Sequence, residues 1–290
     1  MNERQDEQLR NVSDTALWVA AYRAEESERP DALFQDPFAR RLTGERGFGL
    51  LGAMPKGRKL AWPMVVRTVL FDRFVLDRLA DGVDLVLNLA AGLDARPYRM
   101  RLPADLLWIE VDLPAMIDYK RDALAAEVPV CRLERVALDL SDRAARRTLL
   151  GEVAARGKKA LVLSEGLLVY LAEDEVAALA TDLAGGAAFR WWAIDLVSPA
   201  LLRYMSRSWG REVGRAGAPF RFAPEAGPDF FRAYGWRPAE IHSSFHAAAR
   251  LHRLPWYYAL LARVFPEARR WNPKRIWGGG CLLERGHSTD

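Results

Sequence analysis

The chain has 290 residues and is 50% hydrophobic, which is enough to bury a substantial core and to form one α/β domain with insertions. Its 42 Lys and Arg residues, spread along the chain, exceed its 38 Asp and Glu residues only slightly, which argues against a nucleic acid partner. The first ten residues are polar and no apolar run approaches the ~18 residues of a membrane span, so we expect a cytoplasmic protein with no membrane partner.

The N-terminal part of the chain is predicted to be helical. Residues 13–28 start with a capping-type serine and carry apolar residues at helical spacing. A second helical piece is expected over residues 37–42, and the glycines and proline of residues 44–57 favour a mobile loop that covers a site. Residues 64–82 then predict a long helix. We therefore assign residues 1–80 to an N-terminal helical lid.

The middle of the chain alternates between strand-like and helix-like segments. Apolar runs of strand character are expected at residues 83–90, 106–113, 130–140, 160–166 and 189–197. Helical patterns lie between them, including residues 114–127 and 172–184. This alternation predicts an α/β fold with a mostly parallel sheet and helices on both faces, and it assigns residues 81–197 to a cofactor-binding core.

The alternation stops at residues 198–233, which are rich in Arg and aromatic residues and are interpreted as an inserted substrate cap. Residues 234–290 are expected to complete the core. They contain a predicted strand over residues 235–245, a helical stretch over residues 256–271 and a last strand over residues 276–286.

Ligands of open α/β sheets bind beyond the carboxyl ends of the parallel strands, so the residues that end each apolar run are the candidate binding residues. The first run ends at Ala90, Ala91 and Gly92, whose small side chains let a ligand approach the backbone, although packing alone also explains them. The second ends at Asp112, twenty residues after Gly92, where a carboxylate can accept hydrogen bonds from both hydroxyls of a ribose. Together these features predict a nucleoside-type ligand.

The third and fourth runs also end in acidic residues. Asp139 and Leu140 offer an acceptor and an apolar wall to an adenine edge, while capping of the following helix is an equal alternative for Asp139. Glu165 ends the fourth run, where a carboxylate can lie close to a cationic centre or an ammonium group.

A phosphate-binding element is missing from these strand ends. A dinucleotide site needs glycines that admit a pyrophosphate to a helix N-terminus, and a P-loop needs Gly-Lys-Ser/Thr. A ribose and adenine site with acidic groups and no phosphate cradle suits S-adenosylmethionine, which carries a sulfonium and an ammonium group. Its carboxylate then needs a cation, for which Arg67, Arg23 and Arg96 are the candidates. Two cysteines without a Cys/His cluster predict no metal site.

Four ordered segments resemble the leucine carboxyl methyltransferase family, including its bacterial branch of S-adenosylmethionine-dependent O-methyltransferases: "NLAAGLDARPYRM", "IEVDLPAMIDYKRDAL", "ALDLSD" and "SEGLLVYL". The resemblance implies a class I methyltransferase (Rossmann-like) fold, with a seven-stranded sheet, an antiparallel last strand, N-terminal helices and an insertion after the fifth strand. The resemblance also implies that the cofactor contacts of the family correspond to these residues: Arg23, Arg67, Ala90, Ala91, Gly92, Asp112, Asp139, Leu140 and Glu165. Relatives often have glycine where this chain has Ala90 or Ala91, and the added methyl narrows the approach to the cofactor.

The acceptor is expected to be a carboxylate or hydroxyl of a small apolar or aromatic, polyketide-like metabolite. Aromatic residues gather around the cap: Trp191, Trp192, Trp209, Phe220, Phe222, Phe230 and Phe231. A carboxylate is ionised near pH 7 and needs only orientation, whereas a hydroxyl benefits from a base. The candidates to orient the acceptor are Tyr170 and, in the cap, Arg203, Tyr204 and Arg207; the candidate bases are His242 and His246.

Two alternative functions remain open at this point. A methyltransferase that acts on the carboxyl terminus of a protein predicts an open groove in place of a closed pocket. A binding module without catalytic activity predicts S-adenosylmethionine binding without methyl transfer. A nucleotide-dependent oxidoreductase is disfavoured because the turn after the first strand is unsuited to phosphate.

Overall fold

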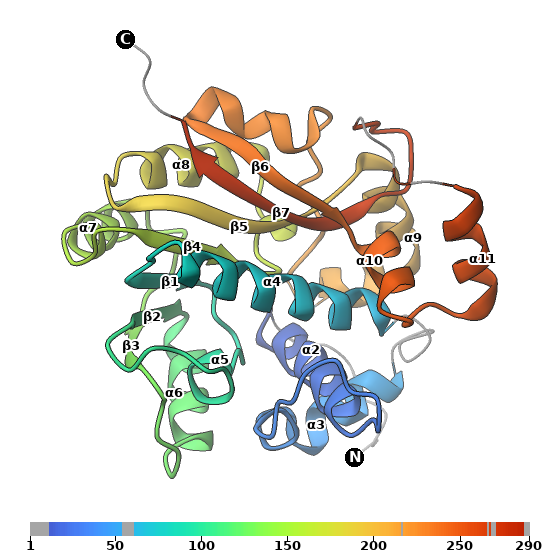
Figure 1. The fold of residues 1–290 in the computed structure, drawn as a ribbon, viewed down its shortest axis with the longest axis horizontal. Helices are drawn as coiled ribbons and strands as arrows, with labels where there is room; N and C mark the ends of the chain where they lie inside the picture. The colour runs from blue at the N-terminus through green and yellow to red at the C-terminus, as the bar shows by residue number, and fades with distance from the viewer. Residues whose placement is uncertain (1–11, 54–60, 216, 266, 268–270, 287–290) are drawn as a thin grey trace.

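A seven-stranded sheet in the order β3-β2-β1-β4-β5-β7-β6 runs through the centre of the molecule (Figure 1). The computed structural model describes residues 12–53, 61–215, 217–265, 267 and 271–286. The strands are β1 (Leu85–Leu89), β2 (Leu107–Asp112), β3 (Arg132–Ala137), β4 (Ala160–Ser164), β5 (Phe189–Val197), β6 (Trp236–Ser243) and β7 (Gly278–Arg285). Strands β1 to β5 pair in parallel, and β7 is antiparallel to both β5 and β6. This topology confirms the α/β fold that the alternation and the resemblance predicted.

Helices cover both faces of the sheet and the edge where the parallel strands end (Figure 1). They are α2 (Val12–Ser27), α3 (Ala39–Ala53), α4 (Trp62–Ala80), α5 (Arg96–Arg99), α6 (Pro114–Ala123), α7 (Arg143–Ala154), α8 (Glu173–Ala184), α9 (Pro199–Arg215), α10 (Ser244–Arg250) and α11 (Trp256–Val264), with 3-10 turns η2 (Leu168–Tyr170) and η3 (Gly227–Tyr234). Within the described residues, no helix is long and apolar enough to cross a membrane.

Alternate residues of the central strands enter two separate hydrophobic cores. Leu85, Leu87 and Leu89 of β1 face α7, α8 and η3, whereas Val86 faces α4 and α10. Because both faces are covered, every residue of β1 is buried, and all of them but Asn88 are apolar. The sheet is therefore a fixed platform, and its strand ends hold their side chains in defined positions.

The prediction of a loop over residues 44–57 was wrong for the described part of this segment, because α3 continues to Ala53. Gly44 has a φ of +58° and interrupts the helix without ending it. Gly47 faces α2, where an added Cβ would lie 2.9 Å from the carbonyl oxygen of Leu17. The leucines that follow Gly47 are buried. Packing against α2 thus overrides the low helix propensity of glycine, and the rest of the segment lies outside the described residues.

The C-terminal elements largely match the expectation. The predicted strands at residues 235–245 and 276–286 correspond to β6 and β7. The helix expected over residues 256–271 is shorter, because α11 ends at Val264. The segment expected to be a cap begins with α9, which follows β5 directly, and η3 covers most of its end.

A buried charge cluster joins β2, α6 and β3. Lys120 Nζ donates to Glu110 Oε1 at 2.7 Å, and Arg135 Nε donates to Glu110 Oε2 at 2.9 Å. Lys120 and Glu110 are both fully buried. Replacement of one partner of such a pair leaves a buried charge undercompensated, which costs about 3–5 kcal/mol.

We therefore expect Lys120→Met to lower the free energy of unfolding in urea by about 3 kcal/mol, near the low end of that range because Arg135 remains. The exposed Lys158 provides the control, since Lys158→Met should change the same quantity by no more than about 0.5 kcal/mol. Equal effects of the two substitutions would contradict the role assigned to the cluster.

Candidate active site

A cavity of about 1550 Å³ lies beyond the carboxyl ends of β1, β2, β4 and β5. Its walls come from these strand ends, from α2 and α4, from α9, and from the segment between β6 and β7. Segments from both ends of the chain therefore enclose the same space. The volume exceeds the roughly 300–1,000 Å³ of a pocket for one small ligand, so the cavity has room for two.

The turn after β1 brings the backbone to the cavity wall. Ala90 has a φ of +52° and Gly92 a φ of +49°, so both are left-handed. For alanine this conformation costs about 1–2 kcal/mol. Neighbouring strands hold the turn, because Ala91 N donates to Val111 O at 3.1 Å and Gly92 N donates to Asp112 Oδ2 at 2.6 Å. All three turn residues line the cavity.

Asp112, the last residue of β2, is held by two backbone amides. Its Oδ2 accepts from Gly92 N, and its Oδ1 accepts from Leu113 N at 2.7 Å. Burial raises the pKa of this carboxyl above its ordinary value. Each carboxylate oxygen has a second lone pair, so the fixed side chain can still accept hydrogen bonds from a ligand.

Asp139 and Leu140 line the cavity next to Asp112. Asp139 Oδ1 accepts from Ser141 N at 2.9 Å. The capping role considered for Asp139 belongs to Asp142 instead, whose Oδ1 accepts from the amides of residues 144 and 145 at 3.0 Å. Asp139 is therefore not needed to cap α7, and it forms part of the cavity wall.

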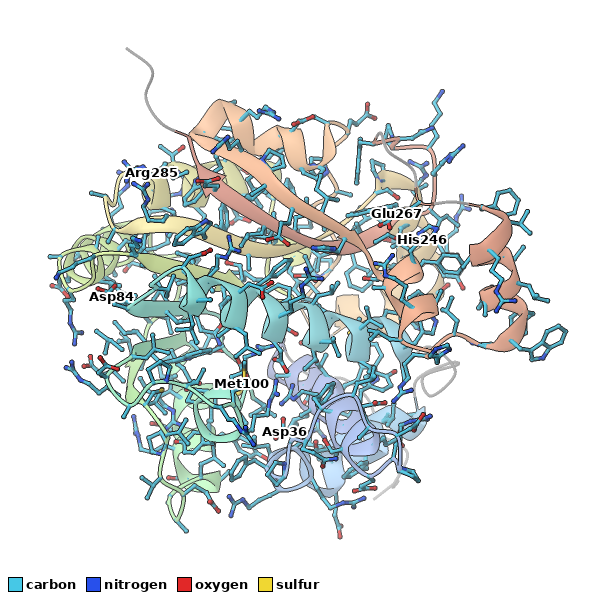
Figure 2. The ribbon with its side chains drawn as sticks, viewed as in Figure 1. Asp36, Asp84, Met100, His246, Glu267 and Arg285 are labelled. Atoms are coloured by element: carbon cyan, nitrogen blue, oxygen red, sulfur yellow. The ribbon has the colours of Figure 1, made fainter. Side chains whose placement is uncertain are left out.

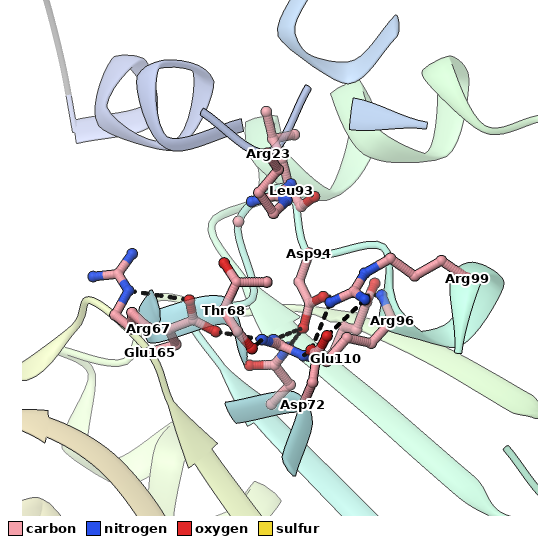
Figure 3. Close-up of polar contacts among 12 residues, drawn as sticks. Arg23, Arg67, Thr68, Asp72, Leu93, Asp94, Arg96, Arg99, Glu110 and Glu165 are labelled. Carbon is pink, nitrogen blue, oxygen red and sulfur yellow. Dashed lines mark hydrogen bonds and ion pairs between the residues drawn. The ribbon is translucent and has the colours of Figure 1, made fainter. Parts of the chain in front are cut away.

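Two carboxylates at the ends of β4 and β5 share one arginine. Arg67 Nε donates to Glu165 Oε1 at 3.1 Å (Figure 3), and Arg67 Nη1 donates to Asp195 Oδ2 at 3.2 Å. Gly166, with a φ of +71°, lies under the guanidinium, where an added Cβ would be 3.0 Å from Nη1. Among the described residues, no hydrogen bond uses Arg67 Nη2, which leaves a donor at the cavity wall.

Arg96 continues this network below the turn after β1 (Figure 3). It is 3% exposed and reaches three carboxylates: Glu165 Oε2 at 2.9 Å, Asp72 Oδ1 at 2.6 Å and Asp94 Oδ2 at 2.8 Å. Burial opposes the ionisation of Asp94, but Arg96 and other nearby cations outweigh it and hold the pKa of this carboxyl well below its ordinary value. Arg99 donates to both carboxylate oxygens of Asp72.

The network also reaches the N-terminal helix α2. Arg23 Nε donates to the buried Asp36 at 2.9 Å, and Arg23 Nη2 donates to Leu93 O at 2.5 Å. Asp36 Oδ2 lies 3.9 Å from Arg99 Nε. The network connects four guanidinium groups, those of Arg23, Arg67, Arg96 and Arg99, with five carboxylates, those of Asp36, Asp72, Asp94, Glu165 and Asp195. One negative charge is therefore left uncompensated within the network.

The same turn is unsuited to a phosphate group. The helix that follows it, α5, has only four residues. Its first amide, Arg96 N, already donates to Asp94 Oδ1 at 2.9 Å, so a carboxylate occupies the place where a pyrophosphate would bind. The arrangement fits a nucleoside ligand with cationic groups better than a dinucleotide.

The other half of the cavity is mainly aromatic. Tyr170 lies at the boundary and stacks on Phe220, with ring centroids 5.8 Å apart and an interplanar angle of 23°. Burial raises the pKa of Tyr170, so its phenol is neutral near pH 7 and can act as a hydrogen-bond donor. Further aromatic side chains line this half: Trp18, Trp62, Trp209, Phe245, Tyr258, Phe265, Trp271 and Trp277.

Three of the predicted acceptor-site residues line the cavity: Tyr170, Tyr204 and His246. His246 Nε2 lies 3.0 Å from Phe265 O, which can only accept, so this nitrogen carries the proton. The other ring nitrogen, Nδ1, lies 3.1 Å from Ser243 Oγ and accepts from it. Figure 2 shows His246, which belongs to α10, near Glu267.

The remaining predicted acceptor-site residues lie outside the cavity lining. His242 Nε2 is 3.0 Å from Glu240 Oε2 on the same strand, and its ring packs against Phe74. Arg203 and Arg207 are exposed on α9. Within the described residues, no group of three or more His, Cys, Asp or Glu side chains could hold a metal ion.

Sequence reasoning missed Asp195, Asp94 and Asp72. Asp195 lies within β5, two residues before its last residue, so the rule that selected the residues ending each apolar run passed over it. Asp94 and Asp72 had no sequence signal. Their role depends on the distance between α4 and the turn after β1, which appears only in three dimensions.

Comparisons with known proteins agree with this geometry. The profile of the leucine carboxyl methyltransferase family matches residues 16–184. A protein of Mycobacterium sp. (strain KMS) is 36% identical over 230 residues, which are 72% of this chain and 76% of that protein. A protein of Streptomyces coelicolor is 39% identical over 178 residues, which are 56% of this chain and 60% of that protein. Both are classed as S-adenosyl-L-methionine-dependent methyltransferases.

Two solved structures share the fold at low sequence identity. A DUF574 family protein of Streptomyces avermitilis gives a TM-score of 0.59 at 14% identity and covers 92% of this chain and 96% of its own. A protein of Thermobifida fusca classed as a methyltransferase gives 0.57 at 14% identity, covering 96% and 95%. Both similarities extend over nearly the whole chain.

The lowered pKa of Asp94 predicts acid sensitivity of the network. An aspartate whose folded pKa is depressed stabilises the fold above its unfolded pKa of about 3.9, and this stabilisation is lost as the pH falls toward the folded value. The free energy of unfolding should therefore decrease between about pH 4 and pH 2, and Asp94→Asn should flatten this dependence. Urea titrations across that range measure it. The exposed carboxylate of α6 supplies the control, Asp118→Asn, and a parallel loss of slope in both variants would contradict the prediction.

Proposed function

The chain belongs to the leucine carboxyl methyltransferase family and uses S-adenosyl-L-methionine as its cofactor, and from this premise we propose that it transfers the methyl group to an oxygen atom of a small apolar or aromatic metabolite. The observation that carries the proposal is the single cavity that joins the charged strand ends to an aromatic compartment. One half suits the cofactor and the other suits an acceptor with a large apolar surface.

The cofactor half offers a partner for each part of S-adenosylmethionine. We assign the ribose to Asp112, whose backbone-held oxygens keep free lone pairs, and the adenine to Asp139 with Leu140. The ammonium group is assigned to Glu165. The carboxylate is assigned to Arg67, which lines the cavity and whose Nη2 makes no hydrogen bond with any described residue.

Charge balance supports the same assignment. S-adenosylmethionine carries a sulfonium and an ammonium cation against one carboxylate, and the network carries one uncompensated negative charge. The excess on each side is opposite in sign, so binding of the cofactor offsets the excess negative charge of the network. A dinucleotide would instead add negative charge beside Asp94, Glu165 and Asp195.

The chain's residues would then act mainly by positioning. When bound, the cofactor supplies a methyl group on a sulfonium centre, which is transferred by in-line displacement. A carboxylate acceptor is ionised near pH 7 and needs no base. The neutral phenol of Tyr170, at the boundary of the two halves, can donate a hydrogen bond that orients it. Alignment in a dry site supplies on the order of 7–11 kcal/mol of the rate enhancement.

A hydroxyl acceptor would involve different residues. Of the two candidate histidines, His246 is the one that lines the cavity, and its Nδ1 accepts from Ser243 Oγ. We propose that this pair takes up the proton of a hydroxyl acceptor. Tyr204 is retained as an acceptor contact, whereas His242, Arg203 and Arg207 lie outside the lining and would act only after a rearrangement.

Cofactor binding is tested by calorimetric titration with S-adenosylhomocysteine and with NADH. We expect binding of the homocysteine compound and none of NADH. Asp112→Ala should weaken the former by roughly tenfold to a hundredfold, because a hydrogen bond to a charged group contributes about 1.5–3 kcal/mol. Asp118→Ala on the exposed side of α6 should leave it unchanged. Tight NADH binding without a response to S-adenosylhomocysteine would refute the assignment.

The acceptor class is tested with polycyclic aromatic acids and phenols against small hydrophilic acids. Methyl transfer to the aromatic compounds should dominate, and base-labile products would identify esters. Tyr170→Phe should lower kcat/KM for an acid by about tenfold to a hundredfold. Tyr234→Phe, at a half-buried tyrosine outside the cavity lining, should not. An absence of preference among the acceptors would contradict an apolar acceptor, and cofactor binding without any transfer would favour a binding module.

A further inference from the structure

Helix α11 exposes its large apolar side chains. Trp256, Leu260 and Val264, at every fourth position, are 75%, 50% and 70% exposed and form one stripe along the helix. Tyr257 and Leu261 form the adjacent stripe and are 48% and 44% exposed. No residue of α11 is buried. A helix of a globular domain normally turns such a stripe toward the core, so this face lacks a partner in the described part of the chain.

This apolar surface borders the mouth of the cavity. Phe265 and Ile276, which are 63% and 70% exposed, extend it and also line the cavity. Tyr258, on the other side of α11, lines the cavity as well. Figure 1 shows α11 at the outer edge of the molecule, beyond α10. We define the α11 patch by these exposed apolar residues: Trp256, Tyr257, Leu260, Leu261, Val264, Phe265 and Ile276.

Positive charge is concentrated in the same segment. Residues 244–277 contain seven Lys and Arg residues and one acidic residue, Glu267, although the whole chain has a net charge of only +4. The remainder of the chain is therefore slightly negative. Two of these cations form ion pairs, Arg250 with Glu267 and Arg253 with Glu26 and Asp31. Arg263 and Lys274 are exposed, and they form no ion pair with any described residue.

We propose that the α11 patch docks on an anionic lipid surface and that the apolar acceptor enters the cavity from there. Exposed Trp, Tyr and Leu side chains flanked by Arg and Lys are the combination by which helices bind in the plane of a membrane interface. The expectation of no membrane partner came from the lack of a spanning segment, which docking does not require. Only the entry of the acceptor rests on the proposed function.

A second copy of the chain fits this face less well. A twofold interface places the same patch of both subunits together, so the cations around the two patches would face each other without compensating acids. An anionic surface supplies the opposite charge. A lipid surface can also contact both exposed stripes of α11 at once, because apolar side chains enter the acyl boundary while Lys and Arg side chains contact the headgroups.

The test is co-sedimentation of the full chain with vesicles of equal parts phosphatidylglycerol and phosphatidylcholine, and with vesicles of phosphatidylcholine alone. We expect binding to the anionic vesicles that weakens as salt is added. Leu260→Asp combined with Val264→Asp should reduce binding roughly tenfold or more, because the free energy gained by moving these two apolar side chains out of water is lost. Val128→Asp, at a residue that is 84% exposed and distant from α11 in the sequence, is the matched control and should bind as the unmodified chain does.

A second variant guards against misfolding of the first. Arg263→Glu combined with Lys274→Glu leaves the apolar surface intact and should weaken binding to anionic vesicles roughly fivefold or more for each cation lost. Absence of binding to anionic vesicles, or binding that both variants leave unchanged, would overturn the proposal. A dimer in light scattering that Leu260→Asp dissociates would overturn it in favour of a second copy. Titration of the same samples with S-adenosylhomocysteine separates failure of docking from failure of the proposed function.

Discussion

The pairing of Glu165 with two arginines is the interaction on which the binding edge depends. Arg67 comes from α4 and Arg96 from the start of α5, while Glu165 follows β4. One carboxylate thus connects a helix on the face of the sheet to two strand ends. Without these cations, the like charges of Glu165 and the neighbouring Asp195 would repel each other and destabilise this edge of the sheet. The network therefore makes an acidic strand edge compatible with a folded protein near neutral pH.

The same network couples the edge to the N-terminal helices. Arg99 and Asp36 extend it to Arg23 on α2, and α2 forms part of the cavity wall. The region expected to be a separate lid is therefore bonded to the core through charged groups as well as through packing. The segment between β6 and β7 also lines the cavity, and it has exposed apolar residues and no buried position along α11.

The convergence of the strand-end residues on one cavity was predictable from the sequence, because these residues follow one geometric rule. Parallel strands end at a common edge, so Ala90, Asp112, Asp139 and Glu165 were assigned to one site from their positions after apolar runs alone. The partners of those residues were not predictable to the same extent. Asp72 is one polar position among many on α4, and only the tertiary structure shows that it meets Arg96 and Arg99.

The wrong prediction at α3 and the inability to select the cavity-lining aromatic residues from the sequence have related causes. Glycines around Gly47 indicated a loop because local propensity was the only signal available, whereas close packing on α2 decides the structure. In the acceptor half, aromatic residues of the core and of the cavity look alike in sequence. Trp192 and Phe231 are fully buried in the core, whereas Trp209 and Phe220 line the cavity.

The most direct measurement of the central claim is a crystal structure of the chain with S-adenosylhomocysteine. The account predicts the ribose hydroxyls on Asp112, the adenine beside Asp139 and Leu140, and the amino acid moiety between Arg67 and Glu165. The pairing of Glu165 with Arg96 should be preserved in this complex. A ligand bound elsewhere in the cavity, or one bound at this edge with Glu165 separated from both arginines, would contradict the account.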